Sequence, residues 1–110
     1  MKTFNLKEGM PSTAVAVLRL RNAIRYAKPE KIVKIIHGYG SHGVGGAIRD
    51  AARKELDAML AEGKIVAYVP GEAVSVPMGF DDEIRRYRIL LSGDPDFRQG
   101  NDGVTYVMLP

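Results

Sequence analysis

The fold of this 110-residue chain is decided by the stretch Lys34-Ile35-Ile36-His37-Gly38-Tyr39-Gly40-Ser41-His42-Gly43-Val44-Gly45-Gly46-Ala47-Ile48-Arg49. An apolar run enters it, a helical pattern leaves it, and two histidines and five glycines lie between. Glycine permits backbone angles with φ > 0 and lets a ligand approach the main chain closely. A helix that begins behind such a loop directs free N–H groups and the positive end of its dipole at it. The stretch therefore predicts a strand, an anion-binding loop and a helix, with phosphate as the commonest biological anion.

Strand and helix patterns alternate on both sides of this stretch. Strands are predicted over residues 3–7, 31–36, 64–69 and 104–109, and helices from Ser12 or Thr13 to about Ala27 and from Gly45 or Gly46 to Glu62. Gly63 is placed to terminate the second helix. In the first helix the apolar positions are Val17, Leu20, Ile24 and Ala27, with Ala14 and Leu18 beside them.

Residues 71–103 are rich in turn-forming residues and predict an extended loop or insertion. Within it, a short helix over residues 83–91 is expected, capped by Asp81 or Asp82. The element order is therefore β-α-β-α-β-loop-β, which indicates the α/β class with right-handed crossovers and a largely parallel sheet. We expect one domain over residues 1–110 in two layers, with both helices on one face of the sheet and the other face partly open.

The composition indicates an ordinary globular protein, with 45% hydrophobic and 26% charged residues. No apolar run approaches the ~20 residues needed to span a bilayer, and a signal-peptide core is not evident. We therefore expect no membrane association. The absence of cysteine fits a cytoplasmic protein without disulfides. Two histidines and no cysteine argue against a structural zinc site, so no metal ligands are predicted.

The charge balance favours a polyanionic partner. The formal net charge is +3 and the pI is near 9.3. Arginine, which matches phosphate geometry bidentately, supplies much of the positive charge: Arg19, Arg21, Arg25, Arg49, Arg53, Arg85, Arg86, Arg88 and Arg98. The alternative is a solvated surface in which 13 acidic residues balance these cations.

The two histidines carry the chemistry that the loop suggests. His37 stands where a strand ends, a position at which open α/β sheets meet ligands. His42 lies inside the loop, and Arg49 and Arg53 follow one and two turns along the helix. Such a set suits phosphodiester chemistry, with imidazole as acid, base or cation and loop amides stabilising the phosphoryl charge. The alternative for His37 is a hydrogen bond that only holds the loop in shape.

Two further patterns in the loop have plainer alternatives. Tyr39 either stacks on a base or sugar or packs the loop against the body of the protein. The spacing Gly38-x-Gly40-x-x-Gly43 matches the dinucleotide fingerprint, which requires an acidic residue at the end of the next strand. Glu72 is the one nearby candidate for that acid, so the sequence argues against a dinucleotide site.

The motif Ile35-Ile36-His37-Gly38-Tyr39-Gly40-Ser41-His42-Gly43, followed by Gly45-Gly46-Ala47-Ile48-Arg49 and Leu56, closely resembles the second motif of the Smr (small MutS-related) domain. Residues 100–109 also resemble the closing glycine turn and strand of that family. The resemblance implies a two-layer βαβαββ fold with a four-stranded mixed sheet and two helices on one face. This fold is similar to the C-terminal domain of the third translation initiation factor.

Smr domains bind nucleic acid, and several nick DNA or cleave RNA. The resemblance therefore implies binding or cleavage at His37, Gly38 and Gly40. Many members carry Leu-Asp-Leu-His-Gly in the first strand, where this chain has Phe4-Asn5-Leu6-Lys7-Glu8. Lys7 replaces a histidine; it can bind phosphate but is a poor general base unless its pKa is strongly lowered. Asn5 replaces an aspartate and loses the charge that a metal favours.

The leading hypothesis is a nucleic-acid-binding Smr-like domain. If the domain is an enzyme, the expected activity is nicking of DNA or endonucleolytic cleavage of RNA. His37 and Lys7 are the candidate catalytic residues, and Mg²⁺ or Mn²⁺ the candidate cofactors. The predicted phosphate-binding residues are His37, Gly38, Tyr39, Gly40, Ser41, His42, Gly43, Arg49 and Arg53. The alternatives are a non-catalytic nucleic-acid-binding module and a small nucleotide- or phosphate-binding protein. DNA or RNA as the substrate and the oligomeric state stay open.

Overall fold

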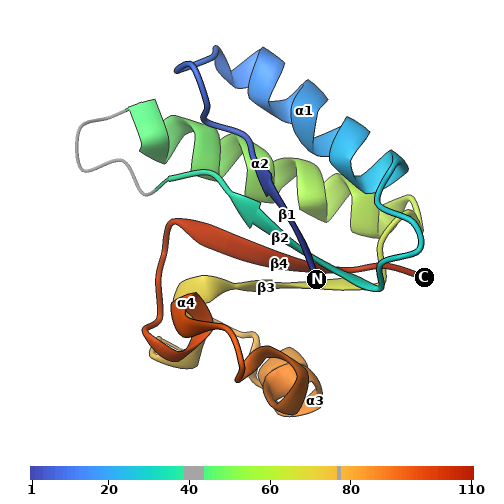
Figure 1. Cartoon of the computed structure of the whole chain (residues 1–110), viewed down its shortest axis with the longest axis vertical. Helices are drawn as coiled ribbons and strands as arrows, with labels where there is room; N and C mark the ends of the chain where they lie inside the picture. The colour runs from blue at the N-terminus through green and yellow to red at the C-terminus, as the bar shows by residue number, and fades with distance from the viewer. Residues whose placement is uncertain (39–43, 77) are drawn as a thin grey trace.

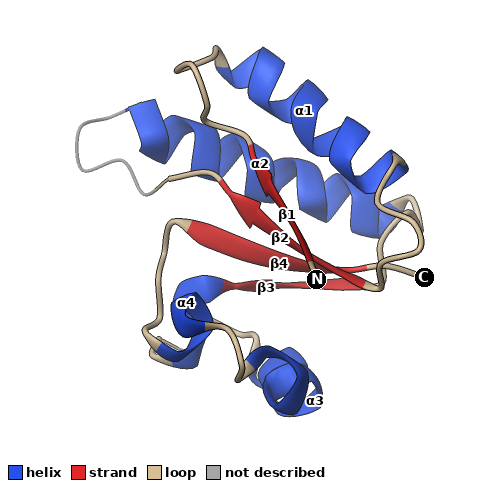
Figure 2. Ribbon diagram, in the orientation of Figure 1, coloured by secondary structure: helices blue, strands red, loops and turns tan. Residues whose placement is uncertain are grey.

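The computed structural model describes residues 1–38, 44–76 and 78–110, which form a four-stranded sheet (Figures 1 and 2). The strands, in the order β1-β2-β4-β3, are β1 (Lys2–Asn5), β2 (Ile32–Ile36), β4 (Val104–Met108) and β3 (Ala67–Pro70). β1 pairs with β2 in parallel, whereas β4 is antiparallel to both β2 and β3. The mixed sheet implied by the Smr resemblance is thus confirmed. The largely parallel sheet expected from the alternation of strands and helices is wrong, because β4 is inserted between two strands of the opposite direction and two of the three strand pairs are antiparallel.

Both long helices, α1 (Thr13–Arg25) and α2 (Val44–Ala61), lie on one face of the sheet (Figure 2). The Ser12 side chain accepts a hydrogen bond from the N–H of Val15 at 3.2 Å, so α1 begins with the predicted cap. Gly63, with φ +73°, terminates α2 as predicted: its N–H bonds to the Leu60 carbonyl and the next N–H to that of Met59. The predicted two-helix layer is confirmed.

The buried side of α1 differs from the prediction by a small rotation of the helix. Ala16, Leu20 and Ala23 are its buried residues, whereas Leu18 is 60% exposed. Two alanines on this side let the helix approach the layer beneath it closely, and the larger Leu18 is left facing outward. The core between helices and sheet includes Leu20, Ile35, Leu56 and Val107.

The 71–103 segment is more ordered than an extended loop. It contains the short 3₁₀ helix η1 (Gly71–Val74), α3 (Asp81–Leu91) and α4 (Pro95–Arg98). These pack on the second face of β3 and β4, where Phe97, Tyr106, Leu91 and Val69 form a second apolar cluster. The expected helix is α3, but Phe80 takes the N-cap position and makes no side-chain capping bond. Asp81 and Asp82 instead lie in the first turn, where negative charge favours the helix dipole.

The two clusters share one sheet and make one compact body. The radius of gyration is 12.8 Å, close to the value of about 13 Å for a folded domain of ~100 residues. Among the described residues, no helix combines the length and apolar character needed to cross a membrane.

Candidate functional site

The predicted site lies at the edge of the sheet where β1 and β2 end. Asn5 pairs with Ile36, and the N–H of Leu6 donates to the Ile36 carbonyl at 2.8 Å. Because the two strands are parallel, Lys7 and His37 leave the sheet at the same edge. The expectation that strand one lies beside strand two is therefore confirmed.

Five of the predicted site residues lie outside the described part of the chain, so their roles stay predictions: Tyr39, Gly40, Ser41, His42 and Gly43. His37, Gly38, Arg49, Arg53 and Lys7 are described.

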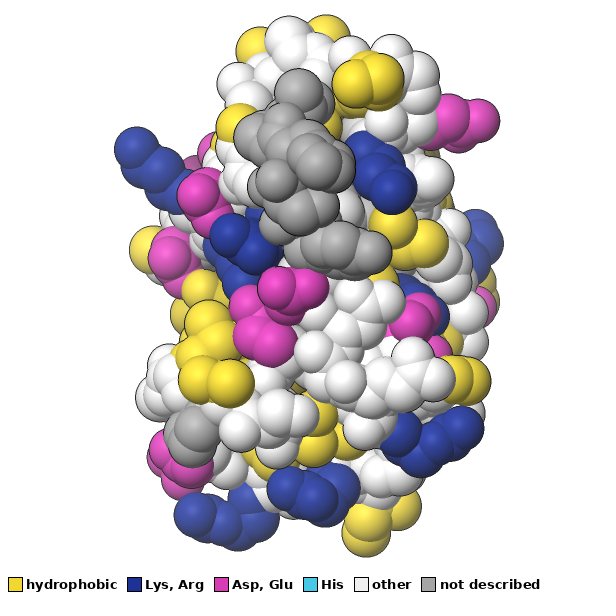
Figure 3. Space-filling view, turned by 90° about the vertical axis from the view of Figure 1, so that its left-hand side faces the viewer, with side chains coloured by type: hydrophobic (Ala, Val, Ile, Leu, Met, Phe, Trp, Pro, Cys, Tyr) yellow, Lys and Arg dark blue, Asp and Glu magenta, His cyan; other side chains and the backbone are white. Residues whose placement is uncertain are grey.

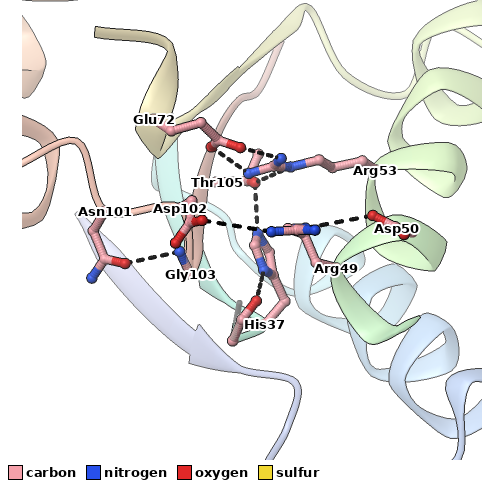
Figure 4. Close-up of polar contacts among 10 residues, drawn as sticks. His37, Arg49, Asp50, Arg53, Glu72, Asn101, Asp102, Gly103 and Thr105 are labelled. Carbon is pink, nitrogen blue, oxygen red and sulfur yellow. Dashed lines mark hydrogen bonds and ion pairs between the residues drawn. The ribbon is translucent and has the colours of Figure 1, made fainter. Parts of the chain in front are cut away.

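His37 is fully buried, and both of its ring nitrogens have partners (Figure 4). Nδ1 lies 2.8 Å from the carbonyl oxygen of Gly38, and Nε2 lies 2.8 Å from the hydroxyl of Thr105. Burial lowers the pKa of His37 to about 4; the bond to Gly38 opposes this shift, and the positive charge of Arg53 adds to it. The imidazole is therefore neutral at pH 7.

Neutrality determines the direction of these hydrogen bonds. A carbonyl oxygen only accepts, so Nδ1 carries the ring proton and donates it to Gly38. Nε2 is then an acceptor, and the Thr105 hydroxyl donates to it. The same hydroxyl accepts from Nε of Arg53 at 3.2 Å. The bonds run in one direction, from Arg53 through Thr105 to His37 and on to Gly38.

Arg53 is held on its other side by Glu72 of η1. Its two terminal nitrogens donate to the two carboxylate oxygens at 2.6 and 2.7 Å, a bidentate pair. The side chains are 15% and 17% exposed. Arg53 was predicted to bind phosphate, but the structure engages its guanidinium with Glu72 and Thr105 inside the protein.

The backbone at the start of the glycine-rich segment is bound to the start of β4. The carbonyl of Gly103 accepts from the N–H groups of both His37 and Gly38, at 3.0 and 3.1 Å. Gly38 has φ +77°, a conformation that favours glycine. Asn101 supports this contact, because its side-chain oxygen accepts from the N–H of Gly103 at 2.8 Å.

Arg49 and Lys7 are the cations that stay accessible at this edge. Arg49 lies 3.6 Å from Asp102 and 3.4 Å from Asp50, and its side chain is 25% exposed. Figure 3 views this end of the molecule and shows basic and acidic side chains interspersed. Pairs with such exposed carboxylates are weak, so Arg49 can exchange them for another anion at little cost.

Lys7 is exposed, and its backbone forms a tight turn after β1. Its N–H donates to the side-chain oxygen of Asn5 at 2.9 Å, and its carbonyl accepts from Met10 at 3.0 Å. Asn5 thus shapes the turn that presents Lys7. Within the described part of the chain, no hydrogen bond or ion pair joins the Lys7 side chain to His37.

This arrangement suits the binding of an anion better than acid–base work by His37. A buried, neutral imidazole with both nitrogens engaged positions the backbone around it. The first turn of α2 has no acidic residue, so the positive end of an 18-residue helix is uncompensated there. In the described residues, no group of three or more His, Asp or Glu side chains is arranged to hold a metal ion. The expected Mg²⁺ or Mn²⁺ stays a prediction.

Sequence reasoning missed the role of Thr105 and the pairing of Glu72 with Arg53. Thr105 has a recognisable signal: it is a polar residue inside the apolar strand Val104–Met108, and all five positions of that strand are buried. A buried hydroxyl needs a partner, and a histidine on the neighbouring strand is a natural one. Glu72 has no comparable signal, because its pairing depends on where the sheet places η1, which begins directly after Pro70 opposite Thr105.

The fold defines a small α+β domain in which Lys7 and His37 leave one edge of a mixed four-stranded sheet. No model of a known protein family matches this chain, and neither does any curated protein sequence or solved structure. The resemblance to Smr domains therefore depends on the motifs at residues 35–49 and 100–109.

Proposed function

We propose that this chain is a nucleic-acid-binding domain similar to Smr domains, acting in the cytoplasm. Its phosphate-binding surface is the sheet edge where β1 and β2 end and α2 begins. The observation that carries this proposal is the parallel pairing of β1 with β2, which places Lys7 and His37 at one edge. His37 and Gly38, the first two residues of the His-Gly-x-Gly motif, lie at that edge.

The charges at this edge support a polyanion as the ligand. Lys7 is exposed on a turn shaped by Asn5, and Arg49 is partly exposed one turn into α2. The uncompensated N-terminus of α2 adds backbone donors and a positive partial charge. A phosphate backbone that runs along the edge can contact all three.

His37 has a positioning role in this proposal. Its hydrogen bonds to Gly38 and Thr105 connect the first residues of the motif to β4. Cleavage of the bound strand is the further activity that the Smr resemblance implies. It needs a reactive group other than the buried imidazole, and exposed Lys7 is the described candidate.

Salt-dependent binding tests the proposal. Fluorescence anisotropy with labelled single-stranded DNA, duplex DNA and hairpin RNA should show log K falling linearly with log salt. Lys7→Ala and Arg49→Ala should each weaken binding and reduce the salt slope by about 1, because each removes one phosphate contact. Arg85→Ala is the matched control, since Arg85 is on α3 with its side chain 78% exposed.

Three outcomes separate the alternatives. A flat salt response, or an equal effect of Arg85→Ala, contradicts nucleic-acid binding at this edge. Tight binding of ATP or inorganic phosphate without oligonucleotide binding indicates the nucleotide- or phosphate-binding alternative. Nicking of supercoiled plasmid or cleavage of the hairpin RNA, with Mg²⁺, Mn²⁺ or EDTA, identifies the endonuclease when Lys7→Ala abolishes it.

A further inference from the structure

A second concave surface lies at the opposite end of the sheet from His37. It is a groove of about 1030 Å³ between α1, the end of α2, the turn before β2 and the residues after β4. Its apolar side chains are Leu18, Ile24, Met59 and Leu109. The five residues of β2 separate this end from His37, a rise of roughly 17 Å. In Figure 1 the last turns of α1 and α2 and the C-terminal residues meet at this end.

The rim of the groove carries an excess of positive charge. Five basic residues line it, Arg21, Arg25, Lys28, Lys31 and Lys64, against one acidic residue, Glu30. Arg21 is paired with Glu55 and Glu62, and Lys64 lies 3.6 Å from Glu62. Glu30 lies 3.6 Å from the amino group of Met1.

Two of these cations, Arg25 and Lys28, have no carboxylate partner within the described residues. Lys31 donates through Nζ to the main-chain oxygen of Pro110 at 2.7 Å. Arg25 lies in the last turn of α1, where a cation favours the helix dipole. This explanation does not extend to Lys28, which lies beyond the helix. The helix dipole also does not explain the apolar side chains of this basic groove. Leu18 is 60% exposed there, and Ile24 and Leu109 are half-buried.

We propose that this groove binds an extended acidic segment of a partner protein. Aliphatic side chains of that segment lie on Leu18, Ile24 and Leu109, and its carboxylates pair with Arg25 and Lys28. The charge complementarity of a basic rim and an acidic segment supplies specificity and speeds association.

The lining of the groove favours a peptide over the other occupants. None of the side chains that line it is aromatic, whereas single-stranded nucleic acid is held by stacking of its bases on aromatic rings. A symmetric contact with a second copy of this chain would place these cations against the same cations. An acidic peptide meets both the apolar and the charged parts of the groove.

An array of synthetic octapeptides made of Glu and Leu in permuted orders provides the probe, with all-Glu and Lys/Leu octapeptides as references. Members of the Glu/Leu set should bind at least tenfold more tightly than either reference. Amide chemical-shift changes in the ¹⁵N-labelled protein should concentrate at Asn22, Lys28 and Leu109. The double variant Arg25→Glu/Lys28→Glu should lose at least tenfold in affinity, and Leu18→Ser should also weaken binding.

The control is Arg85→Glu/Arg86→Glu, which makes the same charge change on exposed positions of α3. It should leave peptide binding unchanged. Both double variants should remain folded with only small decreases in melting temperature, because all four side chains are exposed while Arg25 loses its favourable place at the end of α1 and Arg85 its ion pair with Asp82. Oligonucleotide binding through Lys7 and Arg49 is measured on the same samples and is expected to persist.

Several results would overturn the proposal. One is an array in which no Glu/Leu peptide exceeds the all-Glu reference. Others are shifts that map away from the groove, or equal losses in the two double variants. Oligonucleotide-induced shifts at Asn22 and Lys28 would identify nucleic acid as the occupant. Concentration-dependent dimerisation that Leu18→Ser abolishes would identify a second copy of the chain.

Discussion

The imidazole Nε2 of His37 lies 2.8 Å from the hydroxyl of Thr105, although the two residues are 68 positions apart in the chain. Both side chains are fully buried. The hydroxyl donates to His37 and accepts from Arg53, so one threonine joins the end of β2 to α2 and η1 (Figure 4). Valine has the same shape as threonine but no hydroxyl, so at position 105 it can neither donate to His37 nor accept from Arg53.

Thr105→Val should therefore destabilise the protein by about 1 to 3 kcal/mol, the cost of leaving buried polar atoms without partners. Nε2 of His37 loses its donor and Nε of Arg53 loses its acceptor. Urea unfolding measures the free energy, and ¹⁵N NMR of the imidazole measures the tautomer, which should be Nδ1–H in the wild type. Thr105→Ser is the control: it retains the hydroxyl and the tautomer. A Thr105→Val protein as stable as Thr105→Ser would show that these hydrogen bonds contribute nothing.

The stability of the protein should fall as the pH falls from 7 to 5, because burial lowers the pKa of His37 to about 4 from its ordinary value of 6.5. The unfolded chain then binds a proton that the folded chain does not, so stability is lost as the pH decreases through this window. The expected loss between pH 7 and pH 5 is about 2 kcal/mol. The pKa values of Asp96 and Glu62 are lowered from ordinary values of 3.8 and 4.5. These two carboxylates therefore titrate mostly below the window from pH 7 to pH 5.

A His42→Gln background leaves His37 as the one titrating histidine. Urea unfolding at several pH values then gives the slope, and the His37 Cε1 proton resonance gives the midpoint of its titration directly. A midpoint above 6 would contradict the buried, neutral imidazole. His37→Asn should remove the slope between pH 5 and pH 7.

The sequence predicts local structure well where one short signal determines it. Ser12 caps α1 and Gly63 terminates α2 as expected, since a side-chain acceptor and a positive φ are properties of single residues. The strand–loop–helix order around His37 follows from the change of apolar periodicity at that point. Pairing of β1 with β2 follows from the short right-handed crossover through α1.

The sequence does not predict features that depend on long-range packing. The pairing of Arg53 with Glu72 exists because β3 pairs with β4 so that η1 begins beside Thr105, and no local pattern encodes that approach. The antiparallel insertion of β4 between β2 and β3 likewise depends on the path of residues 71–103. The ion pair that engages Arg53 inside the protein is therefore not visible in the sequence.

The Arg53–Glu72 ion pair should be strongly coupled in a double-mutant cycle. Glu72→Met leaves a nearly buried guanidinium with Thr105 as its remaining partner, which should cost about 3 kcal/mol. Adding Arg53→Met should recover at least 1 kcal/mol of this loss, because no charge is then left unpaired. The single Glu72 variant should also lower the pKa of His37, since the negative charge of Glu72 raises it. Additive free energies with an unshifted His37 titration would exclude the coupling.

Lys34 should hold the α4 region against the sheet. Its ammonium group is 12% exposed and contacts Asp94, at 3.0 Å, and Asp96. Burial lowers the pKa of Lys34, but hydrogen bonds to Asp96 and Asp94 outweigh this effect and raise it overall. Hydrogen bonds from Lys34 and Asn101 hold the pKa of Asp96 below its usual range. Tyr106 also donates to Asp94, at 3.1 Å.

Lys34→Met retains the length of the side chain but leaves two carboxylates without their cation, and Asp94 is only 8% exposed. We expect a loss of about 3 kcal/mol at pH 7, because a buried charge is left uncompensated. Lowering the pH should reduce the difference from the wild type, since the depressed pKa of Asp96 contributes stability that is lost as the pH falls through it. Hydrogen exchange should accelerate first at the amides of Asp96 and Asn101, which lie in the released segment. Lys54→Met, at an exposed position of α2, is the control, and equal losses in the two variants would refute a specific role for Lys34.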